Sequence, residues 1–101
     1  MIARIWHGRV PAEKSDAYWE FTKGRAIPDY KSVSGNRGVY ILRRSEGAVA
    51  HFLTLTFWDS MDAVRNFAGE DAAKAKYYPE DDNYLLEFEP MVRHYEVYSE
   101  E

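Results

Sequence analysis

The beginning of the chain alternates between a strand-like segment and a segment with helical periodicity. Residues Ile2–Val10 are mostly β-favouring and end at Pro11, which predicts a strand. The next segment, Ala12–Ile27, predicts an amphipathic helix because its stripe recurs every three or four residues. That stripe consists of Ala17, Tyr18, Phe21 and Arg25. We expect Pro28 to end or kink this helix, since proline lacks the amide that a helix interior uses.

Two β-favouring segments in the middle of the chain predict a hairpin. They are Val39–Arg44 and Ala48–Trp58, and a short connection containing Gly47 joins them. One face of the second segment is apolar except for a single histidine, and the other mixes aromatic and threonine side chains. The two faces are His51, Leu53, Leu55 and Phe57, and Phe52, Thr54, Thr56 and Trp58. Neither face has the polar character of a solvent-exposed surface, so we expect both faces to be covered.

The last third of the chain predicts a helix, a second helical piece and a final strand. Asp59 or Ser60 can cap a helix that ends at Gly69. The alanine-rich run Glu70–Tyr78 predicts a further helical piece. The segment Met91–Tyr98 alternates again and predicts the final strand.

The resulting order, β-α-β-β-α-β, predicts one domain over residues 1–101. It is typical of the α+β, ferredoxin-like class, in which a four-stranded antiparallel sheet carries both helices on one face. The other face also has apolar side chains. A second copy of the chain can cover it through a two-fold interface, so we expect a homodimer and a dimeric α/β barrel.

Composition narrows the classes of function. The chain has 8 Tyr, 5 Phe and 3 Trp, more large rings than one small core can hide, so some should line a pocket or a partner surface. With no cysteine, disulfides and thiolate chemistry are excluded. A net charge of −4 without a basic tract argues against nucleic-acid binding. No apolar run is long enough to span a membrane and no signal peptide is recognisable, so we expect a cytoplasmic protein that does not bind membranes.

Several segments give the chain a resemblance to the antibiotic biosynthesis monooxygenase family of dimeric α/β barrels. They are the opening strand 2–10 with Pro11, residues 57–61 running into 64–69, residues 77–82, and the ending 90–97. The resemblance spans nearly the whole chain and implies the fold already predicted. Because this scaffold hosts oxygenases, haem-degrading enzymes, isomerases and proteins without known chemistry, the motifs specify fold better than function.

The resemblance implies oxidation of a small or polycyclic phenolic compound without metal, flavin or any other cofactor. Trp58 matches the family tryptophan, whereas Thr54 stands in place of a pocket asparagine and Val64 near a pocket tyrosine. In the haem-degrading branch an asparagine and a histidine serve the site, and here Ile5 and Ala68 lie near those positions. The segment from Asp59 to Phe88 contains no histidine, so we expect no haem ligation of that kind.

The candidate catalytic residues are His7 and His51, which can share a phenol proton, and Arg43, which can steady an anion. The candidate substrate-binding residues are Phe52, Thr54, Trp58, Tyr77 and Tyr78. Each also has a purely structural interpretation, as a sheet histidine, a core ring or an ion-pairing arginine. His7, His51 and His94 would form a metal site only if they converged, and we expect none. The alternative functions are a non-catalytic dimer that binds an aromatic or lipid-like ligand, and a lyase or isomerase.

Overall fold

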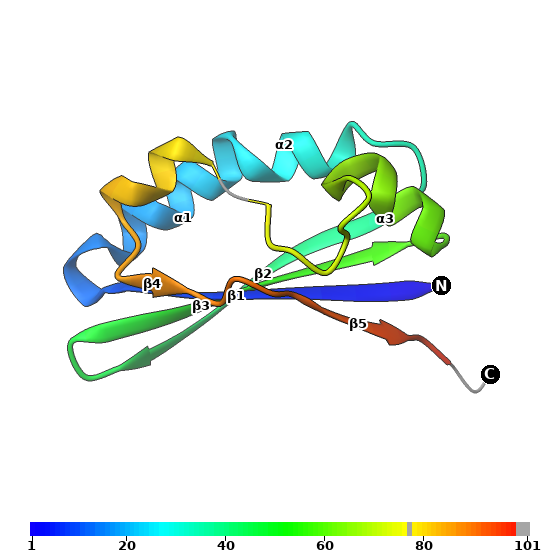
Figure 1. Cartoon of the computed structure of the whole chain (residues 1–101). Helices are drawn as coiled ribbons and strands as arrows, with labels where there is room; N and C mark the ends of the chain where they lie inside the picture. The colour runs from blue at the N-terminus through cyan, green and yellow to red at the C-terminus, as the bar shows by residue number, and fades with distance from the viewer. Residues whose placement is uncertain (77, 99–101) are drawn as a thin grey trace.

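The computed structural model describes residues 1–76 and 78–98. Its sheet has the strand order β2-β3-β1-β4, and β5 also pairs with β1. The strands are β1 Ile2–Pro11, β2 Asn36–Glu46, β3 Val49–Trp58, β4 Glu87–Phe88 and β5 Arg93–Glu96. All pairings are antiparallel. The helices lie together on one side of this sheet (Figure 1). The predicted α+β, ferredoxin-like arrangement is therefore confirmed, with two short strands sharing the position of the single predicted last strand.

The first predicted helix is divided into three pieces. A 3-10 turn, Ala12–Lys14, leads into α1, Ser15–Gly24, and α2 follows as Ala26–Lys31. The break lies at Arg25, whose backbone angles of φ −112° and ψ −58° depart from the helix. Pro28 explains it, because a proline ring clashes with the carbonyl four residues earlier, here that of Gly24. The predicted kink is confirmed, and the helix continues past Pro28.

The second helix predicted from the sequence is α3, which spans Met61–Ala68 and begins as predicted. The Ser60 hydroxyl accepts a hydrogen bond from the Ala63 amide at 3.2 Å, and Gly69 ends the helix with φ 89°. None of the helices in the described ranges is both long and apolar enough to cross a membrane.

The further helical piece predicted at Glu70–Tyr78 is wrong for residues 70–76. This stretch is irregular, and Lys74 forms an isolated antiparallel bridge with Met91. The amide of Ala75 donates to the Pro90 carbonyl at 2.8 Å, and that of Val92 donates to Ala73 at 2.7 Å. A helix this short is marginal without tertiary packing, and pairing with the segment before β5 satisfies the same backbone groups.

The register of β1 and β3 assigns alternate residues to two faces. Trp6 lies opposite Thr54, and Gly8 opposite Phe52, on the face that the helices cover. His7 lies opposite Leu53, and Ile5 opposite Leu55, on the other face. We call this second face the open face, because no helix covers it (Figure 1). Its side chains include Ala3, Ile5, His7, Arg9, Tyr40, Leu42, Arg44, His51, Leu53, Leu55, Phe57, Arg93 and Tyr95.

Candidate functional site

The sheet separates the predicted catalytic histidines from most of the predicted substrate-binding residues. Phe52, Thr54 and Trp58 occupy alternate positions of β3 and point toward the helices, where all three are buried. His7 and His51 stand on the open face. The structure thus does not bring the two groups into one pocket. Among the other predicted residues, Tyr77 lies outside the described residues.

The helix side of the sheet is filled by aromatic side chains. Trp58 is fully buried and packs against Tyr30 and Phe67, with ring centroids 6.4 and 5.5 Å away. Its Nε1 donates a hydrogen bond to the Thr56 hydroxyl at 2.8 Å. A space lined by Thr54 and Tyr78 amounts to about 20 Å³. That is room for about one water molecule, so the space beside Thr54 and Tyr78 holds no aromatic ligand in this conformation. A separate hollow of about 350 Å³ is lined by Trp19, Ile41, Arg43 and Phe52.

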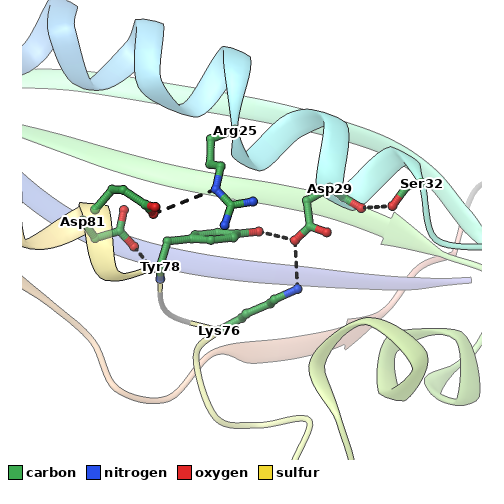
Figure 2. A network of polar contacts seen from close by, with 7 residues as sticks. Arg25, Asp29, Ser32, Lys76, Tyr78 and Asp81 are labelled. Atoms are coloured by element: carbon green, nitrogen blue, oxygen red, sulfur yellow. Dashed lines mark hydrogen bonds and ion pairs between the residues drawn. The ribbon is translucent and has the colours of Figure 1, made fainter.

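Tyr78 belongs to a polar network that joins Lys76 and Tyr78 to Asp29 of α2 (Figure 2). Its hydroxyl and the Lys76 ammonium both donate to the Asp29 carboxylate, the latter at 2.8 Å. The Arg25 guanidinium lies over the Tyr78 ring, 4.8 Å from its centroid, and the Tyr78 amide donates to Asp81. Burial and the neighbouring Asp29 raise the pKa of Tyr78, so its hydroxyl stays a donor at neutral pH. The network adjoins the helix-side core, to which the Tyr78 ring belongs.

Asp29→Asn is expected to lower the free energy of unfolding at pH 7 by about 2 kcal/mol, a typical value for a hydrogen bond to a charged group. Burial opposes ionisation of Asp29, but the bonds from Lys76 and Tyr78 outweigh it and lower its pKa. Its contribution is therefore present above the unfolded pKa of about 3.9 and is lost as pH falls through the lower folded value. Urea unfolding should show the difference between wild type and variant at pH 7 closing toward pH 3.

Asp62→Asn is the matched control, because Asp62 pairs with Arg65 on the surface with its side chain 91% exposed. Its replacement is expected to cost about 0.5 kcal/mol or less. A difference for Asp29→Asn that stayed constant over the pH range would contradict the ionic role of Asp29.

Arg4 is a buried cation that sequence reasoning missed. It is 1% exposed, and its Nη2 donates to the Lys74 carbonyl at 3.3 Å. Burial lowers the pKa of Arg4, and it lowers that of His94, which lies directly opposite on β5. His94 therefore lies on the helix side, away from His7 and His51. Within the described ranges no three potential ligand side chains converge on a metal position.

On the open face, His7 and His51 form a direct hydrogen bond. His7 Nε2 lies 3.0 Å from His51 Nδ1, and the rings are nearly parallel, with centroids 5.3 Å apart and 9° between planes. Since such a bond needs one donor and one acceptor, the bare nitrogen of one ring accepts the N–H of the other. In a neutral pair the donating ring keeps its second nitrogen bare and free to accept another proton. A carboxylate stands at each end of the pair: Glu89 3.3 Å from His7 Nδ1 and Glu46 3.9 Å from His51 Nε2. In this row of four side chains, one imidazole can accept a proton and the neighbouring carboxylate can stabilise the resulting cation.

The histidine pair borders a hollow of about 480 Å³ in the open face. Ile5, Leu42 and Leu53 supply apolar side chains. The complete lining is Ile5, His7, Leu42, Arg43, Arg44, His51, Leu53, Glu89 and Arg93. This size suits a small organic ligand, and the combination of an apolar surface with a few convergent polar groups is typical of binding sites.

All three predicted catalytic residues thus line one hollow, although Arg43 has another task. Its Nη1 donates to the Ser15 hydroxyl at 3.1 Å and to Asp16 at 2.8 Å, which ties β2 to the beginning of α1. Arg44, Glu89 and Arg93 were missed as site residues. Strand alternation could have indicated Arg44, because it lies opposite His51 in the hairpin register.

No protein-family model matches the sequence, and no curated protein is similar enough to count as a relative. Solved structures are similar in fold. A Bacillus cereus protein provisionally named an antibiotic biosynthesis monooxygenase is 15% identical, with a TM-score of 0.69 and coverage of 99% of this chain and 95% of that one. The haem-degrader MhuD from Mycobacterium tuberculosis, solved with two haems in its active site, is 21% identical, with a TM-score of 0.67 and 99% and 98% covered.

A NIPSNAP domain protein from Burkholderia xenovorans is 14% identical, with a TM-score of 0.60 and 98% and 96% covered. The three proteins differ in the names they carry, and their likeness to this chain lies in the arrangement of the backbone. Over nearly its whole length, the chain therefore has the α+β fold seen in antibiotic biosynthesis monooxygenase proteins.

Proposed function

We propose that the protein is a homodimeric, cofactor-independent oxygenase that acts on a small phenolic compound in the open-face hollow. The observation that carries this proposal is the hydrogen-bonded pair of His7 and His51 beside an apolar cavity of about 480 Å³. The shared fold with proteins named as monooxygenases and with a haem-degrading enzyme supports an oxidative role.

The dimer follows from the apolar character of the open face. Tyr40, Leu42 and Tyr95 are 56%, 45% and 49% exposed. Tyr40 and Leu42 lie opposite Leu55 and Leu53, and Tyr95 lies opposite Ala3 on the same face. A contiguous apolar surface of this kind marks an interaction site in a monomer. A second copy that placed its own open face against this one would bury both surfaces and close the hollow to bulk water.

The histidine pair supplies the proton chemistry of the proposed reaction. A phenolic hydroxyl that reaches the free nitrogen of the donating imidazole loses its proton to it, and the neighbouring carboxylate, Glu89 or Glu46, stabilises the imidazolium. The electron-rich phenolate then reduces dioxygen directly. For a methylene carbon activated by the phenolate, one oxygen atom forms the new carbonyl and the other leaves as water with the two hydrogens. The substrate provides all the electrons, so the balance needs no other reductant.

The test is oxygen uptake by the pure protein with hydroquinones and anthrones. His51→Phe is expected to lower the rate at least 100-fold, a typical contribution of a general base. His94→Phe is the matched control, because it removes the same side chain from the opposite side of the sheet. It should keep most of the activity, provided that circular dichroism shows the same fold.

Two outcomes would contradict the proposal. Equal losses in His51→Phe and His94→Phe would place the chemistry outside the open-face hollow. A thermal shift with these compounds but no protein-dependent oxygen uptake would instead indicate a non-catalytic binding dimer.

A further inference from the structure

Arginines outnumber carboxylates in the lining of the hollow, although the chain is negative overall. The formal net charge is −4, yet the lining contains the arginines 43, 44 and 93 and a single carboxylate, Glu89. A cavity with apolar walls concentrates the field of such charges and attracts ligands of opposite sign. An anion is therefore attracted where one of these arginines has no carboxylate partner.

Within a single chain, one of the three arginines is available to a ligand. Arg43 bonds to Ser15 and Asp16, and Arg44 lies 2.5 Å from Glu46. Glu89 is paired with His7. Arg93 makes no ion pair with any carboxylate in residues 1–76 and 78–98, and its side chain is exposed at the wall of the hollow. A guanidinium in this situation can bind a carboxylate through two parallel hydrogen bonds.

The position of Arg93 relative to the histidines suggests the shape of the ligand. Arg93 lies opposite Ile5, and His7 follows two residues further along β1 on the same face. Two residues of a strand span about 7 Å between Cα positions, so Arg93 and His7 can contact different ends of one aromatic ligand. Ile5 and Leu53 offer apolar surface between the two polar groups.

We propose that the hollow binds an aromatic carboxylate that carries a hydroxyl at the opposite end of its ring. Arg93 binds the carboxylate, the ring packs on Ile5, Leu42 and Leu53, and the hydroxyl reaches the pair of His7 and His51. This deepens the proposed function, on which it rests for the fate of the hydroxyl, by naming the substrate class.

Calorimetric titration of the full chain at neutral pH tests this, with 4-hydroxybenzoate as the probe. Two analogues complete the series: 4-hydroxybenzamide, which keeps the shape without the charge, and 2-hydroxybenzoate, which moves the hydroxyl. We expect 4-hydroxybenzoate to bind at least tenfold more tightly than either. Arg93→Gln should remove the preference for the acid over the amide, and Arg93→Lys should keep part of it.

Arg37→Gln is the matched control, because Arg37 is an exposed arginine of β2 paired with Asp59 outside the hollow. It should leave all three affinities unchanged. Equal binding of acid and amide, no binding of either, equal binding of the two acids, or an unchanged preference in Arg93→Gln would each overturn the inference.

The two proposals fail in distinguishable ways. Oxygen uptake with neutral hydroquinones that survives Arg93→Gln, together with no preference for the acid, would leave the oxygenase standing and remove the carboxylate class. Arg93-dependent binding of 4-hydroxybenzoate with no oxygen uptake for any compound would do the reverse.

Discussion

Leu55→Asp is expected to turn a dimer of this protein into a monomer at micromolar concentration. Leu55 lies between Ile5 on β1 and Tyr40 on β2, near the middle of the apolar part of the open face. In a two-fold dimer each substitution places one carboxylate in the interface of each subunit, so the penalty is incurred twice. An unpaired charge removed from water costs several kcal/mol even after relaxation. The dissociation constant should therefore rise by about a thousandfold or more.

Analytical ultracentrifugation measures this directly. Ala17→Asp serves as the matched control, because it adds the same charge at an exposed position of α1 on the far side of the sheet. It should remain a dimer. If the unmodified protein sedimented as a well-folded single chain at the same concentration, the shared open face would have no basis.

Trp58→Ala is expected to lower the free energy of unfolding by about 4 kcal/mol, within the range for deleting a buried large aromatic side chain. Trp58 is 0% exposed, contacts Tyr30 and Phe67, and satisfies its Nε1 with Thr56. The substitution removes both rings' packing partner and leaves a cavity between α2, α3 and β3. Small domains are stable by about 5–15 kcal/mol, so this loss is a large part of the total. Urea unfolding at pH 7 measures it.

Trp19→Ala is the control for Trp58→Ala. Trp19 is only partly buried on α1 and lies near Lys23 at the surface. Its replacement should cost about 1 kcal/mol. A loss for Trp58→Ala no larger than that for Trp19→Ala would contradict the structural role of Trp58. Trp58→Phe should keep oxygen uptake per folded molecule, since the sheet separates Trp58 from the hollow.

The fold could be predicted because local signals and tertiary packing agree over most of the chain. The alternation in β3 and the Ser60 cap each indicated an element that the structure contains. Pro28 indicated the kink between α1 and α2. The stretch 70–76 failed because alanine content favours a helix only where packing supports one, and here pairing with residues 90–92 competes.

The candidate site was only partly accessible from sequence. His7 and His51 could be recognised as candidates, but their contact depends on the diagonal offset between β1 and β3. That offset sets the distance between two residues that are 44 positions apart in the sequence. The periodicity within one strand carries no information about it. Strand alternation already assigned His51 to one face of the segment and Phe52 and Trp58 to the other. It could not tell which of the two faces borders a hollow.

The alternation in β3 also gives the protein two surfaces that can change independently. Even-numbered residues from Ala50 to Trp58 determine whether the chain folds, whereas odd-numbered residues from His51 to Phe57 face the hollow and its surroundings. A lineage could thus exchange His51 or Leu53, and with them its ligand, without weakening the packing beneath. Related proteins with the same backbone could then differ in chemistry through substitutions at the odd-numbered positions of β3 alone.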